Sequence, residues 1–277
     1  MKRLQGEKSG ESADSSIAKQ PQIGLMPLSY TQQRIWFLQQ LYPDNRAYNM
    51  NEAWRVRGPL NVSALQQALQ KVVARHSSLR TCFMARDNEP MQKVLDDIPL
   101  PLNLNDISHL PTLEREQALL EMVLAEGNYD FDLSRAPLIR VSIIRLDSKD
   151  HVLQLVLHHI ITDEWSNDII WRELADYYTR ALESDTGDLS EVAIQYTDYA
   201  RWQREQVASR AFDRQMRYWG DQLSGDLPLL QLPTDRPRPA EQSLRGGIVR
   251  RFLPAELLQK VQMLSQQAGA TLYATLL

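Results

Sequence analysis

The chain has few cysteines, no excess of positive charge and no long apolar run, and each of these absences excludes a class of structure or partner. Its 277 residues include one cysteine, Cys82, which excludes an internal disulfide and a multi-cysteine zinc site and is typical of the reducing cytoplasm. The net charge of −4 provides no basic surface for nucleic acid. No apolar run approaches the roughly 18 residues that a membrane span needs. We expect a cytoplasmic protein with no nucleic-acid partner and no contact with membranes.

The remaining composition is that of an ordinary globular protein. Hydrophobic residues make up 43% of the chain and charged residues 24%. A chain of this length can bury the core of one large domain or of two smaller ones. Residues 1–24 are rich in Ser, Lys, Glu and Gln and poor in bulky apolar residues. Such a segment cannot offset its ordering entropy, so we predict a flexible leader.

Residues 25–185 carry alternating helix and strand patterns, which predict an α/β lobe with a mixed sheet in a two-layer α+β sandwich. Ser29 and Gln32 form a capping box at the first helix, and Gly127 is suited to a left-handed helix end. The run 151–157 is apolar on both faces, which predicts a central strand. Hydrophobic periodicity predicts helices at 28–41, 62–76, 113–126 and 163–182, and strands at 48–56, 79–84, 138–145 and 151–157.

Beyond the lobe we predict a helical connector and a Pro-rich crossing over 186–240, followed by the start of a second, similar lobe at 241–277. The connector holds two helices, near 196–208 and 210–223, and a stiff extended segment over 227–239. The final part reads as a strand at 247–253 and a helix at 254–267, with Pro254 at its first position. The chain ends in an apolar segment, which we interpret as a truncated lobe.

Two adjacent histidines, His158 and His159, end the central strand, and Asp163 then opens a helix. Neighbouring residues of a strand point to opposite faces, so the pair is poorly placed to chelate one ion, and we expect no metal. One ring should face the core and the other a cleft. Neutral imidazole is a natural general base near pH 7. Spacing alone leaves this role and two merely structural histidines equally open.

Four segments together resemble the N-terminal half of a condensation domain of nonribosomal peptide synthetases. PLSYTQQRIWFLQQL, ending at residue 41, resembles the first motif of that family, and RHSSLRTCF, residues 75–83, resembles the second. HHIITDEWS, residues 158–166, resembles the HHxxxDG motif, and YTDYARWQ, residues 196–203, resembles the fourth. The four occur in the order of the family.

The resemblance implies a V-shaped pair of chloramphenicol-acetyltransferase-like lobes with a tunnel between them, of which this chain supplies the first lobe and the start of the second. It implies an acyltransferase-type enzyme that forms an amide bond between a donor thioester and an acceptor aminoacyl thioester. Donor and acceptor carrier proteins present these substrates on phosphopantetheine arms, with an adenylation domain adjacent and no cofactor bound directly. Alternatives within the superfamily are epimerisation, ester formation and a non-catalytic module that recruits partners.

The resemblance also assigns roles to individual residues. His159 becomes the catalytic ring, as a base or as an orienting group, and His158 its inward structural partner. Asp163 is expected to form an ion pair with Arg80, or to cap its helix, or both. We interpret Arg75 and the histidine after it as the exposed end of their helix.

One residue departs from the family pattern. Glu164 stands where the family usually has glycine, and this carboxylate could face solvent, contact an incoming ammonium group or narrow the tunnel. Together with Trp165 and Ser166 it is a candidate for contact with the tunnel or the substrate. We interpret Tyr196 and Tyr199 as packing residues of the connector.

Overall fold

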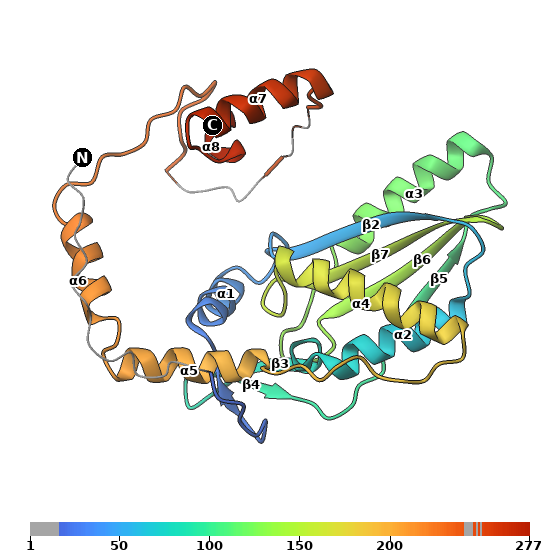
Figure 1. The fold of residues 1–277 in the computed structure, drawn as a ribbon, viewed down its shortest axis with the longest axis horizontal. Helices are drawn as coiled ribbons and strands as arrows, with labels where there is room; N and C mark the ends of the chain where they lie inside the picture. Colours follow the sequence, from blue (N-terminus) through green and yellow to red (C-terminus); the bar gives the residue numbers. More distant parts are fainter. Residues whose placement is uncertain (1–16, 241–245, 248, 250) are drawn as a thin grey trace. The chain divides into compact units, whose positions relative to one another are not determined.

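The structure, a computed structural model, describes residues 17–240, 246, 247, 249 and 251–277 (Figure 1). The chain divides into two compact units, Met1–Leu227 and Pro228–Leu277. The predicted boundaries near residues 185 and 240 stay predictions. Most of the predicted leader, residues 1–16, lies outside the described residues.

A four-stranded sheet forms the centre of the first unit. Its order is β2 (Asn49–Arg57), β7 (Asp150–His158), β6 (Ile139–Asp147) and β5 (Leu102–Asp106). The pairs β2–β7 and β7–β6 are antiparallel, whereas β5 runs parallel to β6. The sheet is therefore mixed, as predicted, and β7 is an interior strand, as its two apolar faces indicated.

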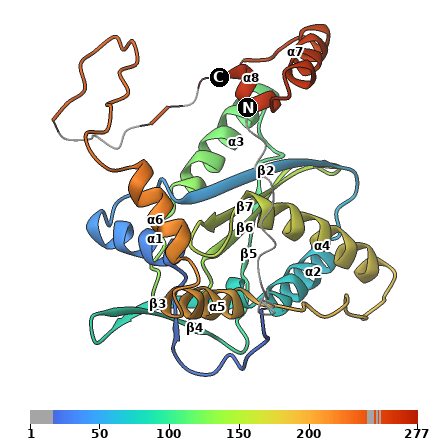
Figure 2. The same ribbon diagram turned by 60° about the vertical axis from the view of Figure 1, so that its left-hand side comes forward.

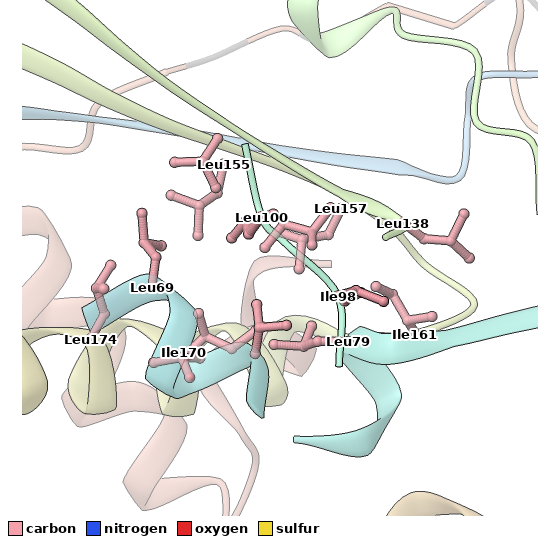
Figure 3. Packing of buried hydrophobic residues seen from close by; sticks show 14 of the residues in the cluster. Leu69, Leu79, Ile98, Leu100, Leu138, Leu155, Leu157, Ile161, Ile170 and Leu174 are labelled. Carbon is pink, nitrogen blue, oxygen red and sulfur yellow. The ribbon is translucent and has the colours of Figure 1, made fainter. Parts of the chain in front are cut away.

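Helices cover both faces of this sheet (Figure 1). On one face lie α2 (Val62–Arg75) and α4 (Glu164–Leu182), and on the other lies α3 (Thr112–Gly127). Leu155 and Leu157 of β7 belong to the larger core cluster with Leu69 of α2 and Leu174 of α4 (Figure 3). Val152, of opposite parity on β7, packs in a second cluster with residues of α3. This alternation between two cores confirms the predicted α/β fold, with helices on each face of the sheet in place of the predicted two layers.

A smaller sheet and one further helix complete the lobe. Its strand order is β1 (Met26–Pro27), β4 (Glu89–Val94) and β3 (Thr81–Arg86), with the short 3-10 helix η1 (Ser77–Arg80) before β3. The sequence patterns had not predicted β4 and β5. The capping box of α1 (Tyr30–Leu41) is confirmed, because Ser29 and Gln32 each accept a hydrogen bond from the backbone of the other.

Gly127 has a different role from the predicted one. It is the last residue of α3, its φ is not positive, and the helix is capped by Asn128. A Cβ atom at Gly127 would lie 2.3 Å from Nδ2 of Asn51 on β2. Glycine therefore leaves room for the Asn51 side chain at the end of α3 and does not form a left-handed helix end.

Two connector helices follow the lobe, α5 (Tyr196–Ala208) and α6 (Asp213–Gln222) (Figure 2). The end of the predicted flexible leader, residues 17–24, is bound to α5. The backbone N–H of Gln20 donates to the Asp198 carboxylate at 3.0 Å, and the Gln22 side chain donates to the Thr197 hydroxyl at 2.8 Å. This part of the prediction was wrong because polar side chains supply the anchoring that apolar residues do not.

The second unit contains α7 (Ala255–Gln267) and α8 (Leu272–Leu276). Pro254 caps α7 instead of occupying its first helical position, and Gly269, just after the helix end, has a left-handed φ of 61°. The predicted strand at 247–253 lies partly outside the described residues, and those of its residues that are described form no strand.

A buried carboxylate joins α4 to the end of α2. Oε2 of Glu173 accepts from Nε of Arg75 at 3.0 Å and from Nε2 of His76 at 2.6 Å. The side chains of Glu173 and Arg75 are 9% and 14% exposed, so little solvent screens the pair. The interpretation of Arg75 and His76 as an exposed helix end is therefore wrong, because both side chains turn back onto α4.

His158 is buried at the end of β7 with 2% of its surface exposed. Its Nδ1 accepts a hydrogen bond from the backbone N–H of Ile160. The ring centroids of Phe131 and Tyr48 lie 6.1 and 6.3 Å from the centroid of the His158 ring. Burial, and secondarily the neighbouring charge of His159, lower the pKa of His158 to about 4. The ring is therefore neutral at physiological pH.

We expect Glu173→Ala to lower the free energy of unfolding by about 3–5 kcal/mol, because it leaves the Arg75 guanidinium buried without its counter-ion. Urea denaturation measures the change. Asp176→Ala, at an exposed carboxylate on the same helix, is the control and should change stability by less than about 0.5 kcal/mol. Equal effects of the two substitutions would contradict the buried ion pair.

A second prediction concerns acid stability. The unfolded chain binds a proton at His158 near the ordinary pKa of about 6.5, whereas the folded chain binds it near pH 4, so the neutral ring stabilises the fold above pH 6.5. Between these two pH values this contribution falls by about 3 kcal/mol as the pH drops. Urea denaturation of the wild type and of His158→Asn across this range should show a steeper loss in the wild type. Parallel curves would show that His158 is not the titrating group.

Candidate functional site

The backbone at the end of β7 separates the two histidines. The N–H of His159 donates to the carbonyl oxygen of Tyr48 at 2.8 Å, so the extended backbone continues one residue past the strand. Successive side chains therefore point to opposite sides. His158 lies in the core, and His159, which is half-buried, lines a cavity. The two residues have the contrasting environments that strand geometry predicts, and their chemical roles stay predictions.

The cavity has a volume of about 380 Å³ and is walled by four parts of the chain. The turn after β7 and the first turn of α4 form one wall, and residues of α1, the segment 76–78 and the segment 192–199 form the others. Its lining residues include no lysine or arginine. They are Thr31, Gln32, Ile35, His76, Ser78, His159, Ile160, Ile161, Thr162, Asp163, Ser166, Val192, Ile194, Gln195, Tyr196 and Tyr199.

A single hydrogen bond defines the tautomer of His159. Its Nδ1 lies 2.6 Å from the carbonyl oxygen of Thr162. A carbonyl oxygen only accepts, so Nδ1 carries a proton and donates it to this bond. In the neutral ring the lone pair therefore resides on Nε2, the nitrogen that a general base would use.

Asp163 caps α4, which was one of its two predicted roles. Its Oδ1 accepts from the backbone N–H of Ser166 at 2.8 Å and from the Ser166 hydroxyl at 2.6 Å. Such a cap satisfies backbone donors at the helix start. The side chain also lines the cavity, so the cap forms part of its wall.

The predicted ion pair between Asp163 and Arg80 is wrong. The structure describes both side chains, and no ion pair joins them; Arg80 instead donates to the backbone carbonyls of Val73, Ala74, Leu95 and Asp96. Burial lowers the pKa of this guanidinium from its ordinary value. Arg80 therefore joins the end of α2 to the chain after β4, where the carboxylates of Asp96 and Asp97 also favour its charge.

The other candidate residues divide between the cavity and the surface. Ser166 lines the cavity and is held by Asp163. Glu164 and Trp165 are exposed on the first turn of α4, Trp165 with 79% of its surface, and neither lines the cavity. The structure thus places Glu164 in solvent, where the positive end of the helix dipole favours a carboxylate.

The sequence patterns missed part of the cavity wall. Tyr196 and Tyr199, interpreted as packing residues, both line it, and the Tyr196 hydroxyl lies 3.0 Å from Oγ of Ser29. Burial raises the pKa of Tyr196. Gln32, the capping-box residue, also lines the cavity and donates to the carbonyl of Ile160 at 3.3 Å. Their grouping with His159 depends on long-range folding, although the first and fourth motifs had marked both segments.

Two features are absent from the described part of the chain. Its residues include no group of three or more His, Cys, Asp or Glu side chains arranged to hold a metal ion. None of its helices combines the length and the apolar character that crossing a membrane requires.

The family model and the similar proteins of known function point to the same family. A family model described as the condensation domain matches residues 22–277. One of the proteins that make up the linear gramicidin synthase of Brevibacillus parabrevis is 39% identical over 280 residues, which cover 100% of this chain and 5% of that protein. Phosphinothricin tripeptide synthetase PhsC of Streptomyces viridochromogenes is 36% identical over 95% of this chain and 24% of that protein. The chain thus spans a small part of these relatives.

Solved structures with the same fold are also known. The X-domain from teicoplanin biosynthesis has a TM-score of 0.79 and 30% identity, and the X-domain in its complex with OxyB has 0.77 and 31%. Each match covers 92% of this chain and 56% of that one. The starter condensation domain of rhizomide synthetase RzmA, at 20% identity and a TM-score of 0.66 over 74% of this chain and 49% of that one, shares the fold. The chain therefore belongs to the condensation-domain family of nonribosomal peptide synthetases.

Proposed function

We propose that this chain contributes the catalytic lobe of a condensation reaction that joins two carrier-bound substrates through an amide bond. The observation that carries the proposal is the geometry of His159. Its Nδ1 is engaged by the Thr162 carbonyl, so its Nε2 lone pair is available at the wall of a 380 Å³ cavity. This is the arrangement of a general base or of an orienting acceptor for an amine.

The proposed step transfers the donor acyl group from a thiol to an amine. The amine of the acceptor aminoacyl thioester attacks the carbonyl carbon of the donor thioester, so a C–N bond forms and the donor C–S bond breaks. Nε2 of His159 accepts the proton that the amine loses, and the departing thiolate of the donor phosphopantetheine takes up a proton in turn. Donor and acceptor carrier proteins, and an adenylation domain that loads the acceptor, are the partners of this proposal.

The lining of the cavity is compatible with such a nucleophile. It contains no lysine or arginine, and its polar groups are hydroxyls, amides, two histidines and the Asp163 carboxylate. A neutral or cationic amine avoids charge repulsion there, whereas a carboxylate substrate would lack a basic partner. Tethered arms that hold both thioesters at this wall would supply proximity, often the larger part of the acceleration.

A second candidate function is a module that recruits a partner protein to the assembly line. It is favoured by the similarity to an X-domain whose structure was solved in complex with OxyB. Glu164, where the family usually has glycine, is the one residue of the motif that points the same way. Retention of both histidines and a base-ready tautomer of His159 favour condensation. Epimerisation and ester formation on the same scaffold would use the same ring with another substrate.

We expect His159→Ala to abolish formation of the condensed product, because no other described imidazole lining the cavity leaves the same nitrogen free: Nε2 of His76 is engaged by Glu173. The measurement is intact-mass spectrometry of the acceptor carrier, with the intact polypeptide that contains this chain and both carriers loaded.

The matched control is His109→Ala, outside the cavity lining, which should leave product formation unchanged. Undiminished product from His159→Ala would contradict condensation by this ring and favour the recruiting module. An acceptor that carries a hydroxyl in place of the amine distinguishes ester formation in the same assay.

Glu164→Gly tests the departure from the family pattern. Because the Glu164 side chain is exposed and lies outside the cavity lining, we expect turnover within about threefold of the wild type, with a loss of stability of about 1 kcal/mol from glycine in the first turn. Single-turnover kinetics and thermal denaturation measure the two effects. A large gain in turnover would show that the carboxylate restricts the passage of substrate.

A further inference from the structure

Thr162, whose carbonyl oxygen accepts from His159, is itself held by a hydrogen bond of its side chain. Thr162 is 6% exposed, and its hydroxyl donates to Oδ1 of Asn167 at 2.8 Å. A β-branched side chain has few rotamers, so fixing this hydroxyl restrains the residue as a whole. Asn167 therefore holds the side chain of the residue whose carbonyl accepts from Nδ1 of His159.

Asn167 is buried, at 3% exposure, and its orientation is set by a charged group. Its Nδ2 donates to Oε1 of Glu52 at 2.6 Å. An ionised carboxylate only accepts, so the amide nitrogen must face Glu52 and the amide oxygen must face the Thr162 hydroxyl. A flipped Asn167 would place an oxygen against the carboxylate and a donor against the donating hydroxyl.

Glu52 reaches this position from a different element. It lies on β2, at the edge of the four-stranded sheet, whereas Asn167 lies on α4. Its Oε2 accepts from the indole N–H of Trp171 on α4 and from that of Trp54 on β2 at 3.4 Å. The two indole rings meet edge to face with centroids 6.0 Å apart. Charge-assisted bonds of this kind are shorter and stronger than neutral ones.

We propose that Glu52 is a positioning residue for His159 and acts through Asn167 and Thr162. The relay Glu52–Asn167–Thr162–His159 crosses from the sheet edge to the cavity wall through the three hydrogen bonds described above. Glu52 does not line the cavity and touches no substrate. Its carboxylate selects the amide orientation of Asn167, which directs the Thr162 hydroxyl and holds the carbonyl that keeps the proton on Nδ1. The effect on turnover rests on the proposed function, whereas the effect on the tautomer does not.

The tautomer is measured directly by ¹⁵N NMR of the histidine rings. The chain has five histidines, and His159→Asn identifies the signals of His159 by their absence. The spectra are recorded at about pH 8.5, roughly two units above the ordinary pKa of histidine, a condition that favours neutral imidazole. We expect wild-type His159 to show a pyrrole-type Nδ1 and a pyridine-type Nε2. In Glu52→Ala and in Thr162→Val, the two nitrogens should shift towards each other as both tautomers become populated.

Thr162→Val removes the middle of the relay with little change of side-chain volume, so it decides the question even if Glu52→Ala fails to fold. Glu89→Ala, at an exposed carboxylate at the start of β4, is the matched control and should leave the tautomer unchanged. Wild-type ¹⁵N signals in both folded relay variants, or in Thr162→Val where Glu52→Ala does not fold, would overturn the proposal. So would a wild-type ring with its proton on Nε2.

The same variants are then assayed in the intact polypeptide with loaded carriers. We expect kcat to fall about 10- to 100-fold in Glu52→Ala and in Thr162→Val, as for a misplaced catalytic group, while KM for the acceptor carrier changes less than about twofold. A change in KM with kcat unaltered would overturn the positioning role. If His159→Ala retains full activity, the proposed function fails, and the ¹⁵N signals still decide the relay.

Discussion

The site depends on the burial of β7 on both of its faces along its whole length. A strand covered on one face would leave alternate side chains in water, and either histidine at its end could then be solvated. Here α2 and α4 cover one face and α3 the other, so the last strand residue, His158, is in the core by parity. The next residue, His159, has the parity of Leu155 and Leu157, so it points to the side of α2 and α4, where the cavity begins. The strand thus sorts two identical side chains into different environments.

Polar contacts determine the position of α4 along its own axis. The apolar residues of its buried face, Ile170, Leu174 and Tyr177, provide most of the burial, but apolar packing is not directional. Two buried polar residues on the same face supply the direction. Asn167 binds Glu52 on the sheet, and Glu173, about 9 Å further along the helix, binds the end of α2. Because each bond has a narrow geometry, a slip of α4 by one turn would break both. The first turn of α4, which forms the cavity wall, is held in register by these two residues.

Local sequence patterns were sufficient to predict most helices and strands and the different environments of His158 and His159. The capping box at Ser29, the central position of β7 and the helix over α2 all follow from short-range spacing. The hairpin between β3 and β4 was missed although its signal is present. Asp87 and Asn88 both have positive φ, and these are the residue types that tolerate a two-residue hairpin turn. The partners of Glu173 on α4 and Glu52 on β2 could not be predicted, because helix and strand patterns are recognised by their apolar residues and do not show which distant group a carboxylate will contact.

The failed ion pair shows how the turn after β7 is held instead. Asp163 and Arg80 each find closer partners, the first in its own helix and the second in backbone carbonyls. The turn is anchored by three other elements: the Tyr48 carbonyl before β2, the Gln32 amide of α1 and the Asn167 amide of α4. Fixing a short turn this firmly costs conformational entropy. A catalytic ring gains from it, because the base must be held in place before the reaction begins. Under the proposed function, the anchoring of this turn holds the Nε2 lone pair of His159 at the cavity wall before the substrates arrive.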